Sequence, residues 1–155
     1  MKISIGCDEA DYELKEAIKK RLEETGHTCV DNGVEAGETA LYPDVAVKTC
    51  EKVTSGECDR GILVCGTGIG MAMTANKVPG IRAAQCTDPY SAERAIKSND
   101  AQIITFGALV TGEAVAKKLV DIWLDSEFDP SCPSGRKVEK IKELDEKWRC
   151  ETAGA

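Results

Sequence analysis

Short apolar runs alternate along this chain with stretches in which apolar residues recur at helical spacing. One run, Gly61-Ile62-Leu63-Val64-Cys65, contains no charged residue and ends where a glycine-rich loop begins. A run of this kind bounded by turn residues indicates a strand buried on both faces. The same criteria predict strands at 2–7, 27–31, 58–65, 81–86 and 101–106, and helices at 12–25, 43–53, 71–77, 88–97, 112–124 and 136–148.

Five strand–helix units in succession define the fold class. Apolar strands that alternate with helices are typical of a parallel sheet covered on both faces, so we expect an α/β fold with a five-stranded parallel sheet. We assign residues 1–150 to one domain and 151–155 to a tail. The fifth helix should turn five residues inward, namely Val115, Ala116, Leu119, Val120 and Trp123.

The last predicted helix differs from the others because it carries only a narrow apolar stripe. Its apolar positions are Val138, Ile141, Leu144 and Trp148. A helix with one such stripe packs against a neighbouring surface, which a second subunit can provide.

The charge of the chain narrows the classes of partner. Its 155 residues carry a formal net charge of −7, whereas nucleic acids and anionic membranes are bound chiefly by clustered lysine and arginine. No apolar stretch has the length of a membrane span, and the N-terminus lacks a signal-peptide core. We therefore expect a cytoplasmic protein that binds a small molecule, with neither nucleic acid nor membrane as a partner.

Eight cysteines are scattered along the chain without a C-x-x-C pair, which argues against a metal site or a redox motif. We expect reduced thiols, most of them acting as small buried hydrophobic residues, and no bound metal. Three of them, Cys7, Cys65 and Cys86, fall at the ends of predicted strands.

The loop after Cys65 carries the best chemical clue. Its glycines, Gly66, Gly68 and Gly70, fit neither a dinucleotide-binding fingerprint, because the third comes one residue early, nor a P-loop. Their spacing alone leaves a tight turn and an anion or oxyanion site equally open. A cysteine that faces a helix N-terminus favours the second, because the helix dipole stabilises a thiolate.

A thiolate beside backbone N–H groups suits two chemistries. It attacks a carbonyl carbon, or it removes a proton from carbon while the N–H groups hold the developing oxyanion. A hydrolase of the Cys–His type needs a histidine, and the one histidine of the sequence, His27, begins the second strand, away from the carboxyl edge of the sheet. We interpret His27 as a surface turn residue.

Acidic and amide residues flank two other strands. Asp8 and Glu9 follow the first strand and so share an edge of the sheet with the glycine loop. Asp8 then either binds a sugar hydroxyl or caps the following helix, and both interpretations stay open. Asn99 precedes the fifth strand, which places it at the opposite edge unless a partner subunit brings it across.

Several segments resemble the type B ribose-5-phosphate isomerases, the family that includes the subunits of galactose-6-phosphate isomerase. The resemblance runs from Met1 to about Trp148. Its most specific segments are Gly6-Cys7-Asp8, Tyr42-Pro43-Asp44, Leu63 to Gly70, Ala75 to Ala84 and Ser98-Asn99-Asp100-Ala101.

This resemblance implies a Rossmann-like three-layer α/β/α domain with an extra C-terminal helix, and a homodimer, or a tetramer of two dimers, with active sites shared between subunits. It implies isomerisation of a sugar phosphate between aldose and ketose through a cis-enediolate, without a cofactor, as in the pentose phosphate pathway. Cys65 would be the base and Thr67 would place its hydroxyl nearby. The remaining implied roles are enediolate stabilisation by the N–H groups of Gly66, Gly68, Ile69 and Gly70, and binding of substrate oxygens by Asp8, Tyr42 and Asn99.

The chain departs from the family pattern in the residues expected to bind phosphate and to open a sugar ring. Glu9 stands where a phosphate-binding histidine is common, Leu109 where an arginine is usual, and Ser98 where a histidine is thought to open the furanose ring. The expected phosphate ligands are then Arg136 and Lys137, because these basic residues lie in the segment before and into the last helix.

Ser98 also bears on the substrate. A pentose 5-phosphate closes a ring through its free O4, whereas the O4 of a tetrose 4-phosphate carries the phosphate, so that no furanose forms. The chain therefore also resembles the branch of the family that acts on erythrulose 4-phosphate. A non-catalytic subunit that retains the fold is the remaining alternative.

Overall fold

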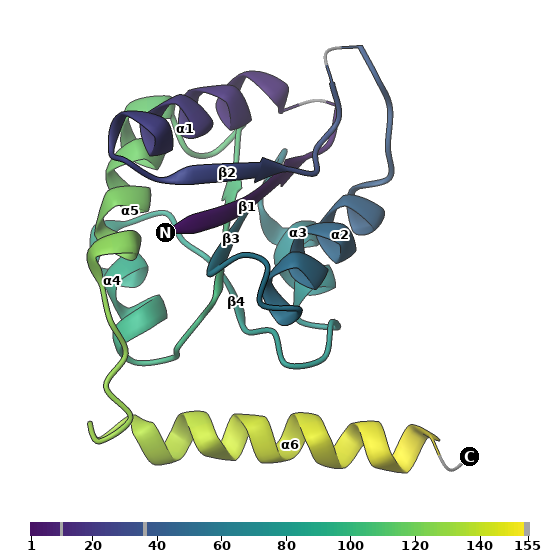
Figure 1. The fold of residues 1–155 in the computed structure, drawn as a ribbon, viewed down its shortest axis with the longest axis vertical. Helices are drawn as coiled ribbons and strands as arrows, with labels where there is room; N and C mark the ends of the chain where they lie inside the picture. Colours follow the sequence, from purple (N-terminus) through teal and green to yellow (C-terminus); the bar gives the residue numbers. More distant parts are fainter. Residues whose placement is uncertain (10, 36, 154–155) are drawn as a thin grey trace.

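Five parallel strands form one sheet, in the order β2-β1-β3-β5-β4 (Figure 1). The computed structural model describes residues 1–9, 11–35 and 37–153, with side chains to Arg149. The strands are β1 (Lys2–Cys7), β2 (Thr28–Asp31), β3 (Arg60–Cys65), β4 (Ala83–Gln85) and β5 (Ile103–Gly107). The helices are α1 (Tyr12–Glu24), α2 (Tyr42–Thr54), α3 (Ile69–Ala75), α4 (Pro89–Lys97), α5 (Glu113–Asp125) and α6 (Gly135–Ala153).

Helices cover both faces of the sheet, which confirms the three-layer α/β fold (Figure 1). Side chains alternate along each strand, so neighbouring residues of β3 enter different cores. Ile62 and Val64 join the core beneath α1, α4 and α5, whereas Leu63 and Cys65 join the core beneath α2 and α3. This alternation turns the Cys65 side chain toward the α2–α3 layer.

The register of the sheet brings the strand ends together. Cys7 of β1 lies opposite Val64 of β3, and Cys65 lies opposite Gly107 of β5. Because the strands are parallel, the residues that follow β1, β3 and β5 meet at one edge, which we call the carboxyl edge. The residues that precede the strands meet at the amino edge.

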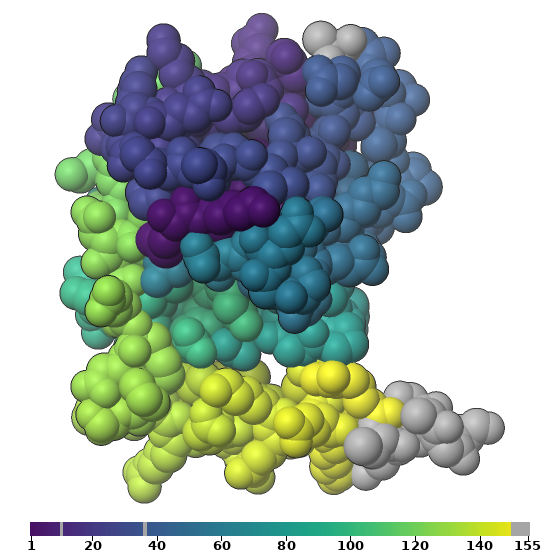
Figure 2. Space-filling model, in the orientation of Figure 1, coloured from purple at the N-terminus to yellow at the C-terminus, as the bar shows by residue number. Residues whose placement is uncertain are grey.

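Helix α6 lies outside the three layers, along the lower rim of the molecule (Figures 1 and 2). Val138 is fully buried, but Ile141, Leu144 and Trp148 are 44%, 43% and 59% exposed. The N–H of Gly80 donates to Asp145 Oδ2 at 2.8 Å, which ties the middle of α6 to the loop before β4. The apolar stripe of α6 is thus only partly covered by its own chain.

Some predicted boundaries and one predicted burial are wrong. β4 has three residues rather than six, and α3 begins at Ile69, two residues earlier than predicted. Val115 is 48% exposed, because Ala116, Leu119, Val120 and Trp123 form the buried stripe of α5 and Val115 falls at its border. The division between a domain ending at residue 150 and a tail stays a prediction.

Seven cysteines are free thiols, and the side chain of Cys150 lies outside the described residues. In the part of the chain that the structure describes, no helix is both long enough and apolar enough to cross a membrane.

Candidate active site

Cys65, the last residue of β3, lies beneath the glycine loop. Its side chain is 6% exposed, and the N–H of Gly68 donates to Cys65 Sγ at 3.2 Å. The N–H of Ile69 donates to the hydroxyl oxygen of Thr67 at 3.3 Å. The sulfur of Cys65 is therefore held against the backbone of the glycine loop.

Close packing on β5 requires glycine in this loop. Gly68 has φ +78°, and a Cβ there would lie 2.9 Å from the carbonyl carbon of Phe106. A Cβ on Gly107 would lie 2.5 Å from the backbone of Thr67. The tight-turn interpretation is therefore confirmed for the backbone, and the N–H to sulfur contact lies in the same turn.

Two polar side chains from neighbouring strands donate hydrogen bonds to carbonyl groups of the loop. The Thr105 hydroxyl donates to the carbonyl of Gly68 at 2.8 Å, and Gln85 Nε2 donates to the carbonyl of Thr67 at 2.9 Å. Our sequence analysis did not single out either residue. The available signals were a polar residue inside the apolar strand β5 and an amide at the end of β4, on the carboxyl edge.

Tyr42, the first residue of α2, lies against the same loop. A Cβ on Gly70 would be 2.8 Å from the ring carbon Cζ of Tyr42, so glycine is needed for the ring to approach. Tyr42 is 40% exposed. Its hydroxyl therefore lies at an open side of the loop, where a ligand can reach it.

Asp8 and Glu9 also lie at the carboxyl edge, since β1 pairs with β3. Glu9 is exposed and Asp8 is half-buried. The N-cap of α1 is Asp11, so Asp8 does not occupy the capping position that one interpretation gave it. The structure thus brings Asp8, Glu9 and Tyr42 to the edge that holds Cys65 and residues 66–70.

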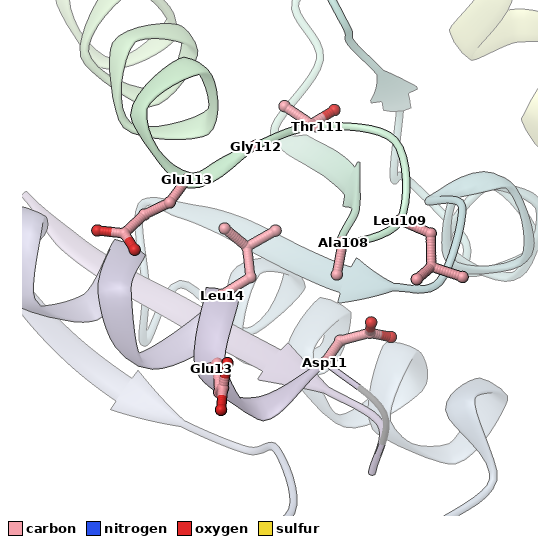
Figure 3. Close-up of a pocket in the computed structure, with 8 residues that line it drawn as sticks. All are labelled: Asp11, Glu13, Leu14, Ala108, Leu109, Thr111, Gly112 and Glu113. Carbon is pink, nitrogen blue, oxygen red and sulfur yellow. The ribbon is translucent and has the colours of Figure 1, made fainter.

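Asp11 is a residue that the sequence analysis missed. Its side chain makes no capping bond, is 2% exposed and lines a cavity of about 320 Å³ between the first turns of α1 and α5 (Figure 3). Burial, followed by a hydrogen bond and the charge of Asp8, raises the pKa of Asp11 to about 7. In the sequence, the signal that could have identified Asp11 was a second acidic residue three positions after Asp8, which follows β1.

The surroundings of Leu109 are acidic. Leu109 is 86% exposed and lies beside Gly66, with Cδ1 3.6 Å from the place of a Cβ on that glycine. The buried Lys15 is paired with Asp31 at 2.8 Å rather than facing the loop. The described residues that line the cavity beside Leu109 thus include the acidic residues Asp11, Glu13 and Glu113 and no basic residue.

The other predicted residues lie at the amino edge. Asn99 donates its amide to the carbonyl of Arg94 at 3.0 Å, and Ser98 Oγ accepts from Arg94 Nη1 at 3.5 Å. Ser98 and Ser134 line one cavity of about 400 Å³, and Arg136 and Lys137 follow exposed in the first turn of α6. Within a single chain, therefore, the predicted residues of the amino edge do not lie beside Cys65. These residues are Ser98, Asn99, Arg136 and Lys137.

His27 lies at the amino edge as well. Its Nδ1 is 3.1 Å from the amino terminus, and the residue precedes β2. This position is incompatible with a Cys–His nucleophile pair within one chain. Among the described residues, no cluster of three or more histidine, cysteine or acidic side chains is placed to hold a metal.

Fold and site define an α/β protein that presents a thiol beneath a glycine loop at the carboxyl edge of a parallel sheet. A family model described as Ribose/Galactose Isomerase matches residues 3–141. The chain therefore belongs to the ribose/galactose isomerase family, and it is an aldose–ketose isomerase of the type B ribose-5-phosphate isomerase kind.

Two relatives and one structure illustrate the similarity. A ribose-5-P isomerase B of Listeria innocua is 54% identical, over 96% of this chain and 100% of its own. A D-erythrulose-4-phosphate isomerase of Pectobacterium atrosepticum is 50% identical, over 91% and 93%. The structure of Clostridium thermocellum ribose-5-phosphate isomerase B matches with a TM-score of 0.91 at 45% identity, covering 96% of this chain and 99% of that one.

Proposed function

We propose that this chain interconverts the aldose and ketose forms of a small phosphorylated sugar, with Cys65 as the base that moves a proton between C1 and C2. One observation carries the proposal. Cys65 Sγ accepts a hydrogen bond of 3.2 Å from the N–H of Gly68, in a chain of the ribose/galactose isomerase family. The sulfur therefore lies beside backbone N–H groups at the edge where parallel sheets bind ligands.

The reaction follows from this arrangement. The Cys65 thiolate takes the proton from C2 of the open-chain aldose, the C–H electrons form the C1–C2 double bond, and the carbonyl electrons move to O1. Backbone N–H groups of residues 66–70 stabilise the resulting enediolate. The proton on O2 passes to O1, a transfer for which the Thr67 hydroxyl is placed, and the Cys65 thiol then protonates C1 to give the ketose.

Substrate oxygens are held by side chains on both sides of the loop. Asp8 and Tyr42 of the same chain bind hydroxyl groups. Asn99 and Ser98 come from a second copy of the chain, together with the phosphate ligands Arg136 and Lys137. The uncovered stripe of α6 supports such a homodimer, because Ile141, Leu144 and Trp148 remain 43% to 59% exposed in one chain.

Two substrates are supported by different observations. The relative in Listeria innocua is called a ribose-5-P isomerase B, which supports a pentose 5-phosphate. Ser98 supports erythrulose 4-phosphate, the substrate in the name of the Pectobacterium atrosepticum relative. A serine hydroxyl is a much weaker acid than the imidazolium that ring opening would use, and a tetrose 4-phosphate needs no ring opening. The seven free cysteines suit a cytoplasmic location.

The test is proton exchange by the purified chain in deuterated water, with ribose 5-phosphate and erythrulose 4-phosphate assayed side by side. Deuterium should enter at the isomerised carbon, and Cys65→Ala should lower turnover by about a thousandfold, because the proposed base is removed. Cys58→Ala is the matched control, since Cys58 is a buried cysteine before β3, at the opposite end of the strand.

Three results would contradict parts of the proposal. Turnover by Cys65→Ala close to that of wild type would refute the base assignment. Absence of exchange with every four-, five- and six-carbon sugar phosphate would leave the non-catalytic alternative. Turnover of ribose 5-phosphate far above that of erythrulose 4-phosphate would remove the four-carbon substrate.

A further inference from the structure

A second carboxyl group lies behind Asp8. Asp11 is 2% exposed, its carboxyl group lies within hydrogen-bonding reach of the Asp8 side chain, and its Oδ2 has no partner among the described residues. Two carboxyl groups form a hydrogen bond only when one of them carries a proton. Asp11 is the better carrier, because it is the more deeply buried of the two.

The groups around Asp11 favour its neutral form. Glu13 of α1 and Glu113 of α5 line the same cavity, and Figure 3 shows the Asp11 side chain projecting toward Ala108 and Leu109. Cys7 of β1 lies within range of the Asp8 and Asp11 charges, and the nearby cation Lys15 is held by Asp31 at 2.8 Å. A carboxylate at Asp11 would therefore lie beside the Asp8 carboxylate while Lys15 is engaged by Asp31.

We propose that Asp11 is a positioning residue that donates a hydrogen bond from its protonated carboxyl group to Asp8 and so fixes the Asp8 carboxylate toward the substrate. This inference rests on the proposed function, in which Asp8 binds a substrate hydroxyl. Asp11 does not touch the substrate. Its contribution is the fixed orientation of Asp8, which does.

The proposal has a direct consequence for pH dependence. Burial, with Asp8 as the second cause, raises the pKa of Asp11 to about 7, so the shared proton is lost as the pH rises through that value. The two carboxylates then repel each other, and Asp8 loses its position.

The test compares KM and kcat of wild type, Asp11→Asn and Asp11→Ala across the pH range from about 5.5 to about 9. In wild type, KM should rise about tenfold above neutral pH while kcat changes little, since a binding group is displaced. Asp11→Asn keeps a donor at every pH, so its KM should stay low and flat. Asp11→Ala has no donor, so its KM should be high and flat.

Glu13→Gln is the matched control, because it removes a neighbouring acid that lines the same cavity and should keep the wild-type profile. A thermal melt of each variant gives a readout without substrate. Relative to Asp11→Asn, wild type should lose stability as the pH rises from about 4 to about 7, because the folded protein binds a proton that the unfolded chain releases.

The outcomes distinguish failure of the positioning role of Asp11 from failure of the proposed isomerase function. A rise of KM in Asp11→Asn equal to that of wild type would overturn the positioning role, even with isomerase activity intact. Equal pH dependence of melting in wild type and Asp11→Asn would show that Asp11 is not protonated and would overturn it as well. Absence of turnover in wild type at every pH would instead contradict the proposed function.

Discussion

The glycine loop at the carboxyl edge and the polar group at the amino edge are built in different ways. The loop is held by its own sheet, with Thr105 and Gln85 bonded to its carbonyls and Gly107 packed beneath it. Arg136 and Lys137, at the amino edge, stand exposed on α6. One chain therefore fastens the glycine loop through its own sheet and leaves Arg136 and Lys137 facing outward.

Part of the amino edge is nevertheless preorganised. Asp100 has φ +48°, a conformation that costs free energy for a residue with a side chain, and Arg82 holds it by bonds to its carboxylate at 2.8 Å and to its carbonyl at 2.9 Å. Asn99 is thus held in an exposed position at the amino edge, away from the glycine loop of its own chain. This supports a role toward a second copy.

The largest effect of the mutations that test this contrast should come from Gly68→Ala. A Cβ there meets the backbone of Phe106 at 2.9 Å and φ is +78°, so the loop has to move away from Cys65. We expect kcat to fall by about a hundredfold, since the N–H to sulfur bond and the oxyanion geometry are lost together. Steady-state kinetics with the accepted sugar phosphate measures this.

Gly26→Ala is the control for backbone strain. Gly26 has φ +81° but no atom within 4 Å of its Cβ position, and it lies at the amino edge. Both variants should lose about 1–2 kcal/mol of stability from the positive φ, and Gly68→Ala should lose more because of the contact. Equal kcat values in the two variants would show that the loop tolerates displacement and has no catalytic geometry to lose.

A smaller effect is expected from the amino edge. Arg136→Ala and Lys137→Ala should each raise KM about tenfold with little change in kcat, because each removes one cation from a phosphate group that does not react. Lys140→Ala is the control, since Lys140 lies further along α6 and is paired with Glu143 at 2.7 Å. Unchanged KM values in both variants would exclude these residues as phosphate ligands.

The sequence predicted the carboxyl edge well, because that edge depends on local order. An apolar run that ends in Cys65 and breaks into glycines places the thiol at a strand end, and Asp8 follows its own strand in the same way. The five-strand parallel sheet and its helical layers are confirmed. What holds the loop was not predicted, because Gln85 and Thr105 come from strands far along the chain.

The role of the amino edge was harder to predict from the sequence, because it also depends on contacts that are not local. The spacing of Asn99 before β5 indicated the opposite edge, and the structure places it there. The proposed connection of Asn99 with Cys65 requires two chains, and no periodicity within one chain encodes such an arrangement. Asp11 was missed because its property comes from burial beneath the turn at Leu109, and burial of that kind is a tertiary effect.

The central claim is that one active site combines Cys65 of one chain with Asn99 of another, and mixing two inactive variants tests it most directly. Cys65→Ala and Asn99→Ala are purified separately, then unfolded and refolded together in equal amounts. If the sites are shared across a twofold dimer, half of the dimers are mixed and each has one intact site, so about a quarter of wild-type activity should return. Failure of the mixture to exceed the sum of the separate variants, with mixed dimers demonstrated by mass spectrometry, would contradict the account.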